Sequence, residues 1–158
     1  ARMSTTTVVE AWTEQPLVRF VGQASARIVV VMTPAGQVLA QHGFTRAVDL
    51  MSAAALSAAI MASSGALAQQ VGERTFGALY HAGQRHGIHL AGCETPRGRL
   101  IVLTVFGRET SIGLVQVFYE EFVIALKQAA PLDEPRGQVL AADFENELNS
   151  SLATLFRR

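Results

Sequence analysis

The chain has 158 residues, which suits one domain that buries on the order of 70% of the surface of its unfolded chain. Thirteen basic and 13 acidic residues balance, and only 16% of residues are charged, so a basic surface for nucleic acid or anionic lipid is not expected. The single cysteine, Cys93, excludes an intramolecular disulfide, and the N-terminus (ARMSTTTVVE) lacks the apolar core of a secretory signal; together they predict a cytoplasmic protein.

Residues 1–13 form a Thr/Val-rich N-terminal arm, and three elements are expected after it. Pro16 is tolerated in the first turn of a helix for which Thr13 is the expected N-cap. The next segment, RIVVVMT, is β-branched and apolar, which is typical of a central strand. A turn at Pro34–Gln37 then returns the chain as a second strand. These elements are Glu14–Ala24, Arg27–Thr33 and Val38–Gln41.

The segment Leu50–Val71 (LMSAAALSAAIMASSGALAQQV) carries no charge and predicts a long helix, with Asp49 as N-cap and Gly72 at its C-terminus. At 100° per residue its large apolar side chains share one stripe, which we assign to the sheet. The opposite side has no polar face, so a partner outside this chain's own core should cover it. That side holds Leu50, Ala54, Ala58, Met61, Ala62, Gly65 and Ala66. The large stripe consists of Leu56, Ile60, Leu67 and Val71.

The same helix is long enough to span a bilayer, but its composition argues against membrane insertion. Eight of its residues are Ala, four are Ser and two are Gln, which makes it only weakly apolar. It also lacks a flanking basic cluster and an aromatic belt. The high hydrophobic content of the whole chain, 49%, therefore indicates a buried protein interface.

The second half of the chain predicts three more strands and two helices. The strands are Thr75–His81, His86–Glu94 and Arg99–Phe106. The third helix, capped by Thr110 or Ser111, has an apolar stripe of Val115, Phe118, Phe122, Ala125 and Leu126. Residues 131–138 form a linker bracketed by Pro131 and Pro135, and residues 139–158 a C-terminal amphipathic helix. Short turns between strands predict an α+β domain at residues 14–130. Its sheet should have five mainly antiparallel strands with helices on both faces. The expected order of elements is α-β-β-α-β-β-β-α plus the C-terminal helix.

Catalytic patterns are nearly absent from the sequence, so we expect a binding protein without a cofactor or metal. The glycines do not form a phosphate loop or a dinucleotide fingerprint. Cys93 could act as a thiol nucleophile with His81, His86 or His89, but it fits a small strand residue better. His86 and His89 point to opposite faces of a regular strand and cannot easily chelate one ion. Four arginines could each serve as a GTPase-activating finger, although surface arginines are common: Arg46, Arg74, Arg85 and Arg108.

Several motifs in order resemble the roadblock/LC7 family, and within it the bacterial MglB branch. They are VVVMTPAGQVLAQHG leading into a helix that closes as GALAQQVGE, then Tyr80-His81-Ala82-Gly83, RLIVLTVF, and TSIGLV at the third helix. The resemblance covers roughly residues 14–130, and DFENELNSSLATLF resembles the C-terminal extension of the same branch.

The resemblance implies a homodimer that binds a Ras-like small GTPase of the MglA type and stimulates GTP hydrolysis in the control of cell polarity or motility. The activation implied uses no arginine finger. The two sheets would join through Thr75, Phe76, Gly77, Ala78, Leu79, Tyr80 and His81, with the second helices side by side. The GTPase would contact Ala58, Met61, Ala62, Gly65 and Ala66 on the second helix. The C-terminal helix would dock through Phe144, Leu148, Leu152, Leu155 and Phe156, or pack back on its own domain.

The sequence departs from the family pattern at two positions, and two alternative functions are also considered. Pro16 should shorten or displace the first helix relative to the family, and Ala66 replaces a second glycine found in some relatives. One alternative is a roadblock scaffold or adaptor without effect on hydrolysis. The other is a ligand-sensing or thiol-based enzyme domain on a PAS-like or profilin-like sheet.

Overall fold

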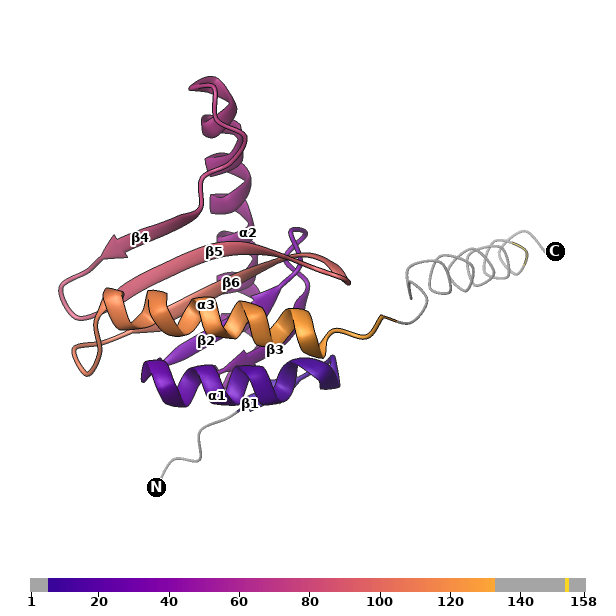
Figure 1. Cartoon of the computed structure of the whole chain (residues 1–158), viewed down its shortest axis with the longest axis vertical. Coiled ribbons are helices and arrows are strands. Elements are labelled where there is room, and N and C mark those ends of the chain that lie inside the picture. Colours follow the sequence, from indigo (N-terminus) through magenta and orange to yellow (C-terminus); the bar gives the residue numbers. More distant parts are fainter. Residues whose placement is uncertain (1–5, 133–152, 154–158) are drawn as a thin grey trace.

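The computed structural model describes residues 6–132 and residue 153, and in that part three α-helices pack on one antiparallel sheet (Figure 1). The predicted linker and C-terminal helix, except for Ala153, Leu132 and Pro131, lie outside the described residues. The elements in chain order are β1 (Thr6–Val8), the 3-10 turn η1 (Ala11–Thr13), α1 (Glu14–Ala24), β2 (Ile28–Met32), β3 (Val38–His42), α2 (Ala47–Gln70), β4 (Ala78–Ala82), β5 (Gly87–Thr95), β6 (Gly98–Phe106) and α3 (Ile112–Ala129).

The sheet has six strands in the order β1-β3-β2-β6-β5-β4, so the prediction of five strands was one short. The additional strand comes from the N-terminal arm, where Thr6, Thr7 and Val8 pair with His42, Gln41 and Ala40 of β3. β-Branched residues suit an extended edge strand, and the Thr6 hydroxyl lies 2.8 Å from His42 Nδ1. Three residues are too few to show the alternating pattern of a strand in the sequence, so β1 is recognised only from its pairing with β3.

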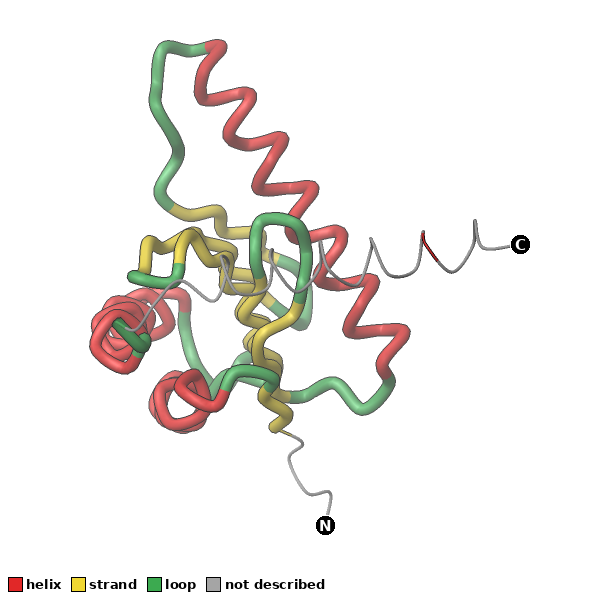
Figure 2. The backbone as a smooth tube through the Cα atoms, turned by 90° about the vertical axis from the view of Figure 1, so that its right-hand side faces the viewer, coloured by secondary structure: helices red, strands yellow, loops and turns green. Residues whose placement is uncertain are grey.

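Helices cover both faces of the sheet and form two separate cores (Figure 2). α1 and α3 lie together on one face, over a core that includes Phe20, Phe122, Val29 and Val102. α2 lies on the other face, over a core that includes Val30 and other large sheet residues. The alternation of side chains along each strand separates the two cores, as in β2, where Val29 and Val30 belong to different ones.

The predicted caps were right at two of four helix ends. Ser111 Oγ accepts a hydrogen bond from Leu114 N at 3.3 Å and caps α3. At the end of α2, Gly72 has φ +81°, and Glu73 N donates to Ala68 O at 2.8 Å, which completes a Schellman motif.

The predictions for the starts of α1 and α2 were wrong in detail. The Thr13 hydroxyl donates to Glu10 O within a 3-10 turn, so it does not cap α1, although the helix spans the predicted residues. α2 begins at Ala47, and Asp49 lies inside its first turn, 3.6 Å from Arg46 Nε. A carboxylate in the first turn still favours the helix through its dipole.

Candidate protein-binding surface

α2 packs on the sheet through its small side chains, and the predicted orientation of this helix was wrong. Ala54, Ser57 and Ala68 are buried in the sheet-facing strip. The large stripe that we assigned to the sheet is exposed instead, with relative exposures of 65% for Leu56, 42% for Ile60, 58% for Leu67 and 62% for Val71. The unpartnered side of α2 is therefore its bulky apolar side.

The size of the sheet side chains explains this orientation. Under α2 the sheet presents Met32, Leu90, Ile101 and Leu103, all buried. Such side chains already fill the space between the layers, so a close approach requires alanine and serine on the helix. A periodicity analysis of α2 alone cannot detect this, because it contains no information about the opposing layer.

The residues predicted to contact a GTPase are divided between two sides of α2. Ala58, Met61 and Gly65 are half-buried, and Met61 packs against the core under the helix. Ala62 and Ala66 are exposed. At 100° per residue they share an outward strip of small side chains with Ala55 and Ala59, which are also exposed. α2 thus presents two outward strips side by side: a small strip (Ala55, Ala59, Ala62, Ala66) and a large strip (Leu56, Ile60, Leu67, Val71).

The second half of α2 extends beyond the sheet on the side of β4 (Figures 1 and 2). The chain turns at Gly72 and runs back beside the helix before it enters β4. Leu67 and Val71 lie in this overhang and are more than half exposed.

By length and composition α2 is the one described helix that could cross a bilayer, and 11% of its most apolar window is buried in this structure. Its sheet-facing strip belongs to the core, so the outward strips are the part that requires a partner.

β4 is an edge strand, and its outer edge has no partner among the described residues. Of the residues predicted for a dimer contact, Ala78–His81 lie in β4, whereas Thr75, Phe76 and Gly77 precede it as a loop. The side chains of β4 are largely exposed, including Tyr80 at 47%. An exposed edge with free N–H and C=O groups can pair with a strand of another chain.

The β4–β5 hairpin is fixed in place by polar contacts at one end of the sheet. Arg27 forms a bidentate pair with Glu109, with N–O distances of 2.7 and 3.0 Å, and its Nη1 lies 2.8 Å from His86 Nε2. The hydrogen bond and the charge of Arg27 lower the pKa of Glu109 to about 2. This cluster joins the residue before β2, the loop before α3 and the turn before β5, whereas pairing with β5 holds β4 in the sheet.

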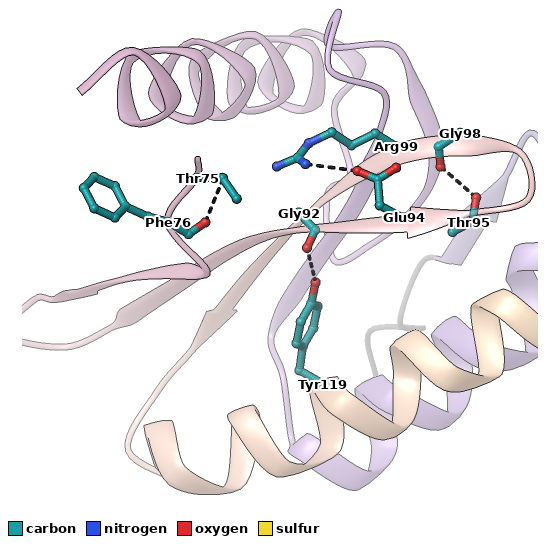
Figure 3. Close-up of polar contacts among 8 residues, drawn as sticks. All are labelled: Thr75, Phe76, Gly92, Glu94, Thr95, Gly98, Arg99 and Tyr119. Carbon is teal, nitrogen blue, oxygen red and sulfur yellow. Dashed lines mark hydrogen bonds and ion pairs between the residues drawn. The ribbon is translucent and has the colours of Figure 1, made fainter. Parts of the chain in front are cut away.

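β5 is held from both faces at Gly92 (Figure 3). Tyr119 of α3 donates to Gly92 O at 3.5 Å from one side. On the other side the Arg99 guanidinium, paired with Glu94 at 3.1 Å, occupies the space that a side chain at position 92 would need. Figure 3 also shows Thr75, whose hydroxyl donates to Phe76 O at 3.1 Å in the segment that leads into β4.

The candidate catalytic groups do not assemble into a site. Cys93 is 8% exposed, and burial raises the pKa of its thiol, so it is not an activated nucleophile. His89 is buried against the Tyr119 ring, and burial lowers the pKa of His89. His86 contacts Arg27, as described above. Within residues 6–132 there is no group of three or more His, Cys, Asp or Glu that could hold a metal ion.

An antiparallel sheet with helices on both faces agrees with the family that the sequence matches. The family model for the Roadblock/LC7 domain matches residues 13–105, and the chain belongs to this family. None of the curated proteins matches the sequence significantly.

Among solved structures, the chain is similar to MglB proteins. The MglB of Myxococcus xanthus shares 26% identity at a TM-score of 0.66, over 73% of this chain and 92% of that one. The gliding protein MglB of Thermus thermophilus shares 24% identity at a TM-score of 0.65, over 76% of this chain and 89% of that one. A structure described as MglB with a tetrameric arrangement shares 22% identity at a TM-score of 0.65, over 82% of this chain and 97% of that one. Roadblock domains of this kind are regulatory or scaffold domains.

Proposed function

We propose that this protein is a cytoplasmic, homodimeric regulator of a Ras-like small GTPase of the MglA type, and that it stimulates GTP hydrolysis in the control of cell polarity or motility. The observation that carries the proposal is the apolar overhang of α2 beside the free edge of β4. Both features require a partner, and both lie on the same side of the domain.

A second copy fits this side of the molecule. Antiparallel pairing of β4 with β4 of another copy satisfies the backbone groups of the edge and is compatible with a twofold axis. The overhanging half of α2 then reaches across the joined sheets, where Leu67 and Val71 become buried. The tetrameric arrangement described for one MglB structure indicates that proteins of this fold associate.

The small outward strip of α2 is the proposed GTPase surface. Ala62 and Ala66 allow the backbone of a partner to approach closely over a flat area, and the alanines at positions 55 and 59 extend that area. Ala58, Met61 and Gly65 contribute less directly, since they are half-buried toward the sheet. In the complex with the GTPase, the C-terminal segment (Phe144, Leu148, Leu152, Leu155, Phe156) is a further candidate contact.

Single-turnover GTP hydrolysis by the cognate GTPase tests this function. The native protein should accelerate hydrolysis, and Ala62→Arg should abolish the acceleration while the protein stays folded and dimeric. Gln116→Arg, which adds the same charge on the exposed side of α3, should leave the rate unchanged. No acceleration at saturating native protein would disprove activation.

The mechanism proposed uses no arginine finger, so the four candidate arginines provide a second test. Replacement of a true finger costs roughly 10³-fold or more in rate. We expect Arg46→Ala, Arg74→Ala, Arg85→Ala and Arg108→Ala each to change the accelerated rate by less than about threefold, far below that cost. The alternative function is a scaffold, which would bind the GTPase through the same strip and leave hydrolysis at its intrinsic rate.

A further inference from the structure

α1 and α3 lie side by side on the face of the sheet opposite α2 (Figure 2). Residues of both helices line a groove along their seam. The two helices are antiparallel and join through Phe20, whose ring stacks on Phe122 at a centroid distance of 4.8 Å. Along their outer seam lies a cavity of about 210 Å³. Its walls are apolar at Pro16, Phe118 and Ala125, and polar side chains at its rim include Gln23 and Gln128. A shallower hollow of about 550 Å³ continues the groove to the C-terminal end of α3.

The groove has the character of a docking site for apolar side chains. A cavity of about 150 Å³ with apolar walls is enough to hold a benzene ring, so the inner cavity has room for one aromatic or aliphatic side chain. Ile124, which also lines it, is 57% exposed and extends the apolar surface beyond the rim. Burial of such a surface is favourable, so an occupant is expected.

We propose that residues 139–158 of the same chain occupy this groove. Their apolar residues recur at helical spacing and form one stripe, whose members are Phe144, Leu148, Leu152, Leu155 and Phe156. The opposite side of the segment is polar, with Asn146, Ser150 and Arg157. Such a segment matches a helix-in-groove mode of binding, in which an apolar stripe fills a groove between two helices.

The connection between α3 and this segment favours the chain's own tail over a separate partner. α3 ends at Ala129, and Ala129 itself lines the mouth of the groove. The residues between Ala129 and Phe144 can extend to roughly 50 Å at about 3.3–3.6 Å per residue, whereas α3, with 18 residues, is about 27 Å long at 1.5 Å per residue. A tether that reaches every point of the groove also raises the effective concentration of the segment to about the millimolar range.

The groove carries charge of both signs, because Glu14 lines its mouth and Glu121 its inner cavity. Arg19 lines both parts of the groove and has no ion pair with another described residue. The first half of the segment contains three acidic residues, Asp143, Glu145 and Glu147. Arg19 attracts these carboxylates, whereas Glu14 and Glu121 repel them. The apolar stripe and the tether, and not charge, therefore carry the proposal.

Hydrogen exchange on the full-length protein tests the docking, with no GTPase present. In the native chain the amides of residues 144–156 should exchange at least about tenfold more slowly than in a free peptide of the same sequence. Ala125→Arg fills the groove, and the double change Leu148→Asp with Leu152→Asp removes the stripe. Each should abolish the protection, and combining them should have no further effect. Gln116→Arg and Ser150→Asp are the matched controls and should preserve it.

The single tryptophan gives an independent readout, because Trp12 lines the hollow at the mouth of the groove. Its emission should shift in Ala125→Arg and in the double aspartate variant, and should stay native in both controls. Circular dichroism verifies that the variants are folded. Unprotected amides in the native chain, or protection that survives Ala125→Arg, would overturn the proposal. Protection that disappears on dilution would overturn it in favour of docking onto a second copy.

Discussion

The replacement Leu67→Gln tests whether the overhang of α2 is a dimer contact. Fully burying a leucine side chain contributes about 1.5–3 kcal/mol, and Leu67 is 58% exposed in the single chain. Burial of that exposed part is therefore worth about 0.9–1.7 kcal/mol per protomer, and a twofold contact counts it twice. The dimer should lose roughly 2–3.5 kcal/mol, which corresponds to a Kd about 30- to 300-fold weaker at 1.4 kcal/mol per factor of ten.

Sedimentation equilibrium measures this change directly, and Leu114→Gln is its matched control. Leu114 is 51% exposed on α3, on the opposite face of the sheet, so the same replacement there should leave the Kd unchanged. Glutamine keeps the helix propensity and the approximate size of leucine at both positions. A Kd for Leu67→Gln within about threefold of native would refute the proposed contact, because burial of that side chain predicts at least tenfold. Equal weakening by both variants would refute it as well.

Three further predictions concern the single domain. Ala54→Leu should lower the free energy of unfolding by about 1–3 kcal/mol, because the larger side chain overpacks the core under α2. Leu56→Ala on the exposed stripe should change it by under about 0.5 kcal/mol at protein concentrations below the dimer Kd. Urea titration measures both. Gly43→Ala should destabilise the fold markedly, since φ is +102° and the added Cβ would clash with Arg27 O; thermal unfolding measures it. The hydrogen bond from Arg27 lowers the pKa of Glu109 from 4.5 to about 2. The contribution of this pair to the free energy of unfolding is therefore complete above pH 4.5 and is lost as the pH falls toward 2. Glu109→Gln should remove this part of the pH dependence, which acid titration of stability measures.

Most of the fold could be predicted from the sequence, because its signals are local. Extended apolar segments predicted five of the six strands, and turn residues placed their ends within three residues of those observed. The Schellman end of α2 and the serine cap of α3 follow from one glycine and one serine with suitable neighbours. β1 was missed because three extended residues become a strand only when the edge of β3 is available.

The candidate surface could be predicted only in part. An uncharged helix of this length indicates by composition alone that more than one side is buried against something. The residues on each side could not be assigned, since the stripe of highest hydrophobicity was taken to be the core stripe. That rule fails where the opposing layer is already full of large side chains, as it is under Ala54 and Ser57.

The sequence by itself determined that this chain forms a roadblock-type domain with an apolar helix that requires a partner, because strand patterns, caps and composition are properties of neighbouring residues. Only the tertiary structure decided which side of α2 faces outward, that its second half extends beside the free edge of β4, and that α1 and α3 leave a groove along their seam. These features depend on the volume available between layers and on where elements distant in the sequence end in space.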